Sequence, residues 1–198
     1  MCSRLPRKRK AALMKELFEA IRAGDSSRVA ALVEADPSLA IFAASIQGET
    51  ANLDELLTAN RSLVSALSTD GWTPLHLAAF FGKKDAARLL LNKGAPVNAR
   101  STNAMENMPL HAAAAGKSTE IAKLLIDHGA NVNARQHGGW TPLHAAAQNG
   151  DLEMARSLVG AGADVQTRAE NNQTALDLAL MGGKQEMVEY LESNGASL

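Results

Sequence analysis

Residues 141–163 read TPLHAAAQNGDLEMARSLVGAGA, and the fold can be inferred from this one stretch. Thr141 is a good helix N-cap, and Pro142 takes the first helical position, where a missing backbone N–H removes no hydrogen bond. Small residues then precede Gly150, which separates the first helical segment from a Leu-rich second one that ends at Gly162. The stretch therefore predicts two short helices joined by a tight turn.

The same pattern recurs along the chain. Thr73-Pro74-Leu75-His76 matches residues 141–144, and weaker copies begin at Met108 and Thr174. The starts at 108, 141 and 174 are 33 residues apart, whereas the step from 73 to 108 is 35 residues, so two extra residues lie within 101–107. Because one helix pair cannot bury its apolar face alone, we expect the repeats to stack as a solenoid.

A 33-residue period with T-P-L-H, a glycine turn, a Leu-rich helix and Val-Asn-Ala at 97–99 and 132–134 resembles the ankyrin repeat. The resemblance is clear over 73–198 and fainter over 41–60, where Asn60 replaces the terminal glycine. It implies an all-α solenoid of stacked helix pairs with short β-hairpin-like fingers. The overall pattern is similar to small stand-alone ankyrin repeat proteins common in bacteria.

We expect a single ankyrin repeat domain over 11–198, preceded by a flexible basic tail over 1–10. The expected units are an N-terminal cap at 11–39, then 40–72, 73–107, 108–140 and 141–173, and a C-terminal cap at 174–198. The first cap leaves no room for a finger before the next unit, which predicts a tight turn at Asp36-Pro37.

The N-terminal cap must cover the end of the core. We therefore expect Phe18 and Ile21 to be buried against Phe42 and Leu53 of the following unit.

The composition excludes several classes of protein. Hydrophobic residues make up 46% of the 198 residues, which is enough for a packed core, and the 37 alanines favour closely packed helices. The single cysteine, Cys2, permits neither an internal disulfide nor a Cys-rich zinc site. No apolar run of membrane-spanning length and no secretory signal are present. We therefore expect a cytoplasmic protein, monomeric by default, with no membrane partner and no cofactor.

Charge is unevenly distributed despite a net charge of −1. The first ten residues carry five cations and no acid, which indicates a solvated flexible end, a nuclear import signal or a weak membrane contact. Residues 71–140 carry eight basic and four acidic residues, which makes an acidic partner segment plausible. No domain-wide basic surface exists, so we expect no nucleic-acid partner.

Three histidines, His76, His111 and His144, recur at one register. They could be metal ligands or bases, but successive repeats place them about 10 Å apart, too far to share one zinc ion with bonds of about 2 Å. The ankyrin resemblance implies a structural role instead, with each histidine bonded to its capping threonine. No catalytic, metal-binding or cofactor-binding residue is therefore predicted, and we expect no enzymatic activity.

The ankyrin resemblance implies that partners bind at finger tips and at the first helices on the concave face. The positions carried over are Trp72, Phe80, Phe81, Met105, Asn107, His137, Trp140, Gln148, Asn149, Asn171 and Met181. We expect Trp72, Phe80 and Phe81 to form one exposed concave patch, because tryptophan is enriched at binding hot spots. The alternative is that the tryptophans pack on neighbouring fingers.

The predicted function is a protein-binding scaffold or adaptor. The alternative is an inhibitor or regulator that masks an enzyme or a transcription factor, and a small-molecule site is a third option. The Met108 unit departs from the repeat pattern, because Met108 lacks the capping hydroxyl and Lys117 occupies the usual inter-helix glycine position. Such a departure is consistent either with function or with drift.

Overall fold

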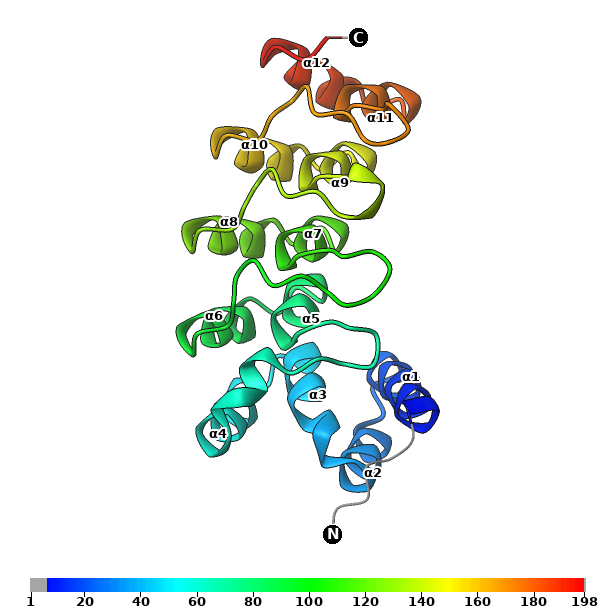
Figure 1. The fold of residues 1–198 in the computed structure, drawn as a ribbon, viewed down its shortest axis with the longest axis vertical. Coiled ribbons are helices and arrows are strands. Elements are labelled where there is room, and N and C mark those ends of the chain that lie inside the picture. The colour runs from blue at the N-terminus through cyan, green and yellow to red at the C-terminus, as the bar shows by residue number, and fades with distance from the viewer. Residues whose placement is uncertain (1–6, 198) are drawn as a thin grey trace.

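The computed structural model describes residues 7–197, and in this range twelve α-helices form six pairs stacked in one elongated array (Figure 1). The pairs are α1 (Arg7–Ala23) with α2 (Ser26–Ala35), α3 (Ala40–Gln47) with α4 (Thr50–Ala59), α5 (Pro74–Phe80) with α6 (Lys84–Asn92), α7 (Pro109–Ala115) with α8 (Thr119–Asp127), α9 (Pro142–Asn149) with α10 (Leu152–Gly160), and α11 (Ala175–Met181) with α12 (Gln185–Ser193). The predicted all-α solenoid is confirmed.

The first helices of the pairs stack into an inner column from α3 to α11, and the second helices form an outer column from α4 to α12 (Figure 1). The loops that precede α5, α7, α9 and α11 project from the inner column as fingers. Helices of seven to nine residues are marginal alone, so packing between repeats must stabilise them.

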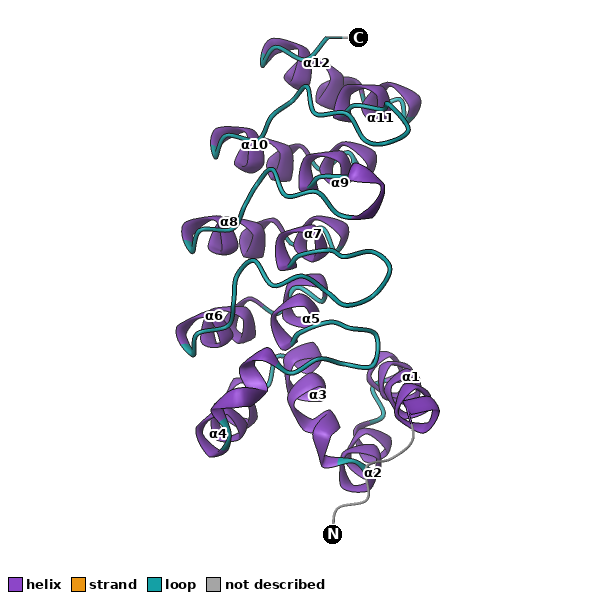
Figure 2. Ribbon diagram, viewed as in Figure 1, coloured by secondary structure: helices purple, strands orange, loops and turns teal. Residues whose placement is uncertain are grey.

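The fingers are hairpin-like in their hydrogen bonding, although residues 7–197 contain no strand (Figure 2). One bond closes each finger: the N–H groups of Ser68, Ser101, Gln136 and Ala169 donate to the carbonyl oxygens of Trp72, Asn107, Trp140 and Gln173 at 2.8–2.9 Å. A second set joins successive fingers, for example from His137 N–H to the Met105 carbonyl oxygen at 2.9 Å. The finger closed by Ser101 encloses the two inserted residues.

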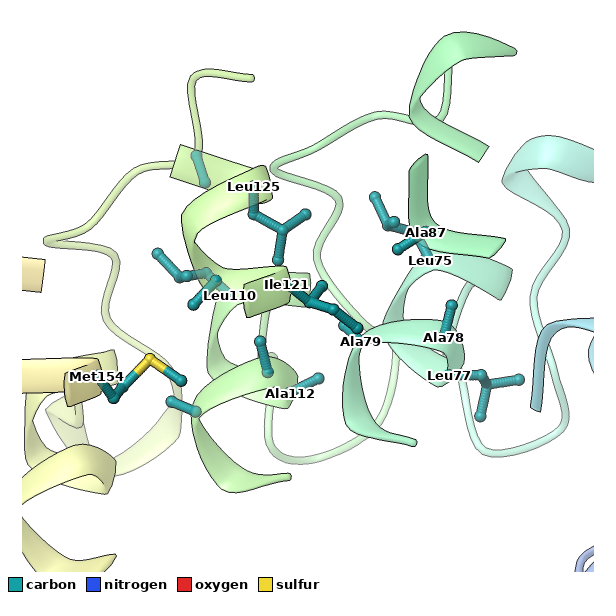
Figure 3. Close-up of a cluster of buried hydrophobic side chains, with 14 of the residues drawn as sticks. Leu75, Leu77, Ala78, Ala79, Ala87, Leu110, Ala112, Ile121, Leu125 and Met154 are labelled. Atoms are coloured by element: carbon teal, nitrogen blue, oxygen red, sulfur yellow. The ribbon is translucent and has the colours of Figure 1, made fainter. Parts of the chain in front are cut away.

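Small side chains set the spacing of the inner column. Ala78 and Ala79 of α5, Ala113 of α7 and Ala146 and Ala147 of α9 are fully buried. Figure 3 shows this layer, in which alanines of α5 and α7 lie among leucines of the same inner helices and larger apolar side chains of the outer helices α8 and α10. Close approach buries the apolar face of each repeat against its neighbours, which no single repeat could do.

The N-terminal cap begins earlier than predicted. Helix α1 starts at Arg7, so residues 7–10 belong to a helix and not to the expected flexible tail. The rest of that tail, residues 1–6, lies outside the described residues. The turn predicted at Asp36-Pro37 is confirmed: the Asp36 carboxylate accepts hydrogen bonds from the Ser38 N–H at 3.1 Å and the Ser38 hydroxyl at 2.6 Å, and 3₁₀-helix η1 (Pro37–Leu39) leads directly into α3.

The hydrogen-bonding pattern of Asp36 and Ser38 recurs at Asn60, the residue that replaces a terminal glycine in the repeat pattern. The Asn60 side-chain oxygen accepts from the Ser62 N–H at 3.1 Å and from the Ser62 hydroxyl at 2.7 Å, and 3₁₀-helix η2 (Arg61–Ser65) follows. Asn60 has φ −147° and not the left-handed backbone of a terminal glycine. The D-P-S-L and N-R-S-L segments at 36–39 and 60–63 therefore form one motif that the 33-residue period hides.

The expected burial of Phe18 and Ile21 is wrong. Both side chains are only half-buried, and Met14 and Leu17 fill the core of the cap instead. Phe18 stacks on Phe81 of the third helix pair, with ring centroids 6.0 Å apart. Helix α1 lies on the finger side of α3 (Figure 1), so this face of the helix is directed toward the groove.

The turn between α7 and α8 has two unusual residues. Lys117 adopts φ +54°, where the equivalent residues of the neighbouring repeats are Gly82 and Gly150. Gly116 lies so close to α5 that a β-carbon on it would sit 2.1 Å from the Phe80 carbonyl oxygen. Lys117 therefore carries a side chain at a backbone conformation that disfavours one, whereas Gly116 is a glycine because the packing leaves no room for a side chain.

We predict that Lys117→Gly raises the free energy of unfolding by about 1 kcal/mol, because a β-carbon is disfavoured at positive φ. Urea denaturation followed by circular dichroism measures the change. The matched control is Lys123→Gly within α8, which should lose about 1 kcal/mol because glycine weakens an ordinary helix. A loss of stability in Lys117→Gly would contradict the prediction.

Gly116→Ala should lower the free energy of unfolding by about 2 kcal/mol or more, because α5 and α7 must separate to admit the methyl group. Gly160→Ala in α10 provides the opposite case, since nothing lies within 4 Å of the position that a β-carbon would take there. That variant should leave the free energy of unfolding unchanged or raise it by up to about 1 kcal/mol. Equal effects in the two variants would show that α5 and α7 do not approach so closely.

Candidate protein-binding groove

Four aromatic rings form a continuous row from the first finger to the N-terminal cap. Trp72 and Phe80 meet edge to face at 5.4 Å, Phe80 and Phe81 meet in the same way at 5.2 Å, and Phe18 completes the row by stacking on Phe81. Such geometries are favourable for aromatic pairs. Phe80 and Phe81 stay 37% and 38% exposed, while Trp72 is half-buried.

The register of α5 explains why these rings face the groove. Ala78 and Ala79 take the positions packed against neighbouring helices, so the chain reaches the end of α5 before large side chains follow at 80 and 81. Trp72 immediately precedes the N-cap Thr73, and its ring runs along α5 to reach Phe80. The three rings therefore lie together as predicted, but only Phe80 and Phe81 are exposed and Trp72 is half-buried.

The row borders a pocket with a volume of about 630 Å³, which we call the aromatic pocket. Its apolar walls are Phe18 and Ile21 of α1, Ile46 of α3, Trp72, Leu77 and Phe80 of α5, and Phe81 directly after α5. The charged side chains that line it are Arg22, Asp70 and Lys83. Its volume lies within the range of about 300–1,000 Å³ typical of ligand pockets.

The sequence missed the contribution of α1. Phe18 and Ile21 belong to the same apolar stripe as the buried Met14 and Leu17, because the four positions recur at helical spacing, and Phe18 lies at the edge of that stripe, where Arg22 follows it. The stripe itself could be found from the sequence, but its spacing does not show that the Phe18 edge is left open to a pocket. The partner of that edge, Phe81, lies more than sixty residues away and has no sequence signal.

A second, smaller pocket of about 410 Å³ lies on the neighbouring fingers. It is lined by Met105, His137, Trp140 and Gln148, together with Gln136 and Gly138. Met105 is 47% exposed, whereas Trp140 is half-buried and packs on His144 at 5.6 Å. These predicted positions thus share one hollow, separate from the aromatic pocket.

The remaining predicted positions behave differently. The prediction for Asn107 is corrected: the residue is only 8% exposed, so it is not open to a partner. Asn149 donates its side-chain N–H to the Ala114 carbonyl oxygen at 3.1 Å and links α9 to α7. Asn171 is exposed at a finger tip, and Met181, 75% exposed, lies at the end of α11.

The histidine register is structural, as predicted. Nδ1 of His76 accepts from the backbone N–H of Thr73 at 3.3 Å and lies 2.8 Å from its hydroxyl, and His144 pairs with Thr141 in the same way. His111 keeps only the backbone bond, from Met108 N–H at 3.2 Å, because methionine has no hydroxyl.

Each histidine also bonds to the far end of its own unit, in or next to the finger that leads to the next inner helix, which the sequence did not indicate. With Nδ1 as acceptor, Nε2 carries the proton and donates to a finger carbonyl oxygen. His76 donates to Asn107 at 3.1 Å, His111 to Ala134 at 3.0 Å, and His144 to Gln173 at 3.2 Å. In the last repeat Asp177 replaces histidine, and its carboxylate accepts from the Thr174 N–H at 2.7 Å.

Burial keeps these imidazoles neutral. It lowers the pKa of His76 and of His111 from 6.5 to about 4, although the carbonyl acceptors partly oppose the shift. Burial likewise lowers the pKa of His144. Both ring nitrogens of each histidine are engaged, so none of the three is free to bind a metal ion or to act as a base. Within residues 7–197 no group of three or more His, Cys, Asp or Glu side chains could hold a metal ion.

The fold and the groove define a class of protein, an α-solenoid of short helix pairs with projecting fingers. A family model described as "Ankyrin repeats (3 copies)" matches residues 17–101 and 110–198, and one described as "Ankyrin repeats (many copies)" matches residues 78–126. The chain belongs to the ankyrin repeat family. No match was found among curated proteins.

Ankyrin repeats generally mediate protein–protein interactions and are typically non-catalytic. Across residues 7–197, no helix combines the length and apolar character needed to cross a membrane.

Acidification should destabilise the protein through the buried histidines. Because their pKa is lower in the folded state, the unfolded state binds more protons below pH 6.5, so stability is complete above that pH and falls toward pH 4. At pH 5 we expect a loss of about 2 kcal/mol for each of His76 and His111.

Thermal unfolding between pH 7 and pH 5 measures this loss. His76→Asp supplies the side chain that caps the last repeat naturally, and should flatten the pH dependence. An unchanged slope in His76→Asp, or a stability that rises on acidification, would show that the buried histidines do not control it.

Proposed function

We propose that the chain is a non-enzymatic scaffold or adaptor that binds a partner protein through its concave face and finger tips. The observation that carries the proposal is the aromatic row around the aromatic pocket, with Phe80 and Phe81 left more than one-third exposed. Clustered aromatic rings in contact with water are favourable to bury, at about 25 cal/mol per Å² of apolar surface.

Exposed apolar side chains are concentrated on this side of the described structure. Phe80, Phe81, Met105, Leu180 and Met181 all lie on fingers or at the ends of inner helices, and Leu67 lies just before the first finger. A partner that follows the inner column would meet these groups in succession. The stacked repeats hold them in fixed positions, so little ordering entropy is lost on binding.

The outer column is less suited to binding. Lys84, Glu120, Lys123 and Glu153 form a line of ion pairs from α6 across α8 to α10, at N–O distances of 2.9, 3.4 and 3.9 Å. Each exposed pair contributes little to stability, but this face is charged and well hydrated. The contrast supports the concave face as the docking surface.

We predict that Phe80→Ser with Phe81→Ser weakens partner binding by roughly a hundredfold, because each buried aromatic anchor contributes about 2 kcal/mol or more at an interface. Quantitative affinity capture from the source cell, followed by titration of the captured partner, measures the loss. The matched control is Tyr190→Ala, which removes a half-buried aromatic ring from the outer column, where it packs under Arg156.

A photo-crosslinking amino acid at position 80 should attach to the partner, whereas the same amino acid at position 190 should not. Equal capture by the double variant and the wild type would overturn the proposal.

A further inference from the structure

The charges around the aromatic pocket are unevenly placed. Lys83 follows Phe81 at the end of α5, and Arg22 lies on the same face of α1 as Phe18, one turn further along. Asp70, the only carboxylate that lines the pocket, comes from the first finger, at the opposite end of α5. The pocket therefore has a basic end at Phe81 and an acidic end at the finger.

A third cation adjoins the basic end. Gly116 packs directly on the carbonyl oxygen of Phe80, which brings the backbone of the next residue, Lys117, close to Phe80. The Lys117 side chain is exposed beside the pocket and does not line it. Across residues 7–197, Arg22, Lys83 and Lys117 take part in no ion pair within 4.0 Å. The carboxylate of Glu120, on the adjacent α8, is already paired with Lys84 and Lys123.

We infer that the aromatic pocket receives one aromatic or leucine side chain of a partner peptide, and that acidic residues beside this anchor face Lys83, Lys117 and Arg22. The inference rests on the proposed function and names the chemistry of the partner. The apolar walls bind the anchor, while the unpaired cations favour carboxylates and disfavour basic segments. Three of the residues that line the pocket, Phe18, Ile21 and Arg22, come from α1, so the N-terminal cap is part of the binding site and not only a cover for the core.

Selection from a displayed library of random peptides of about 12 residues, against the full chain, tests the inference without a known partner. We expect the enriched peptides to carry an aromatic residue or leucine with Asp or Glu within about three positions. Fluorescence polarisation of a labelled selected peptide then gives affinities. Binding should weaken steeply between about 50 and 500 mM salt, because exposed charge pairs are screened.

The decisive variant is Lys83→Glu with Lys117→Glu, which should weaken the selected peptide by about tenfold and remove most of its salt dependence. The matched control, Arg61→Glu with Arg88→Glu, makes the same charge change at exposed sites outside the groove and should have no effect. The Lys83 side chain also packs over Gly48, so its replacement could change the local packing as well as the charge. Arg22→Glu on α1 therefore provides a second test. Circular dichroism verifies that each variant is folded.

The outcomes separate this inference from the proposed function. The inference is overturned, and the proposed function is not, if the selected peptides require Phe80 and Phe81 but are not enriched in acidic residues. The same conclusion follows if the peptides bind the charge-reversal variants with unchanged affinity. If Phe80→Ser with Phe81→Ser binds all selected peptides as the wild type does, both fail. A concentration-dependent dimer that protects the pocket, detected by light scattering, would make a second copy the occupant and also overturn the inference.

Discussion

The close approach of successive inner helices governs the geometry of the whole solenoid. Fully buried alanines line the contacts from α5 to α11, and at Gly116 even a methyl group would collide with the backbone of α5. Because each helix has only seven or eight residues, it is stable only as a member of the stack. Spacing, finger alignment and the position of the groove all follow from this contact.

The same close approach places the aromatic residues. Ala78 and Ala79 fill the packed positions of α5, whereas Trp72, Phe80 and Phe81 lie at its two ends, along the groove. Helix α1 then closes one end of the groove with Phe18 and converts an exposed row into a pocket. The element that terminates the core therefore also shapes the candidate binding site.

Neutral histidines join the repeats at the base of the fingers. His76 and His144 each accept from their own helix cap and donate to the last residue of the finger that leads to the next inner helix, so one side chain links the bases of two successive inner helices. Both roles require the neutral form, and burial maintains it by lowering the pKa. The recurring histidines therefore have a structural role in the repeat. His111 keeps both backbone hydrogen bonds, although Met108 provides no capping hydroxyl.

The repeat period, the caps, the inter-helix turns and the threonine–histidine pairs could all be predicted from the sequence, because they depend on residues close together in the chain. The grouping of Trp72, Phe80 and Phe81 was predictable as well, since they lie within or directly beside one short helix. The packing of α1 against α5 and the burial of Asn107 in the lengthened finger emerged only from the three-dimensional arrangement. Those contacts join segments outside the regular period, where stacking geometry, and not local sequence, selects the neighbours.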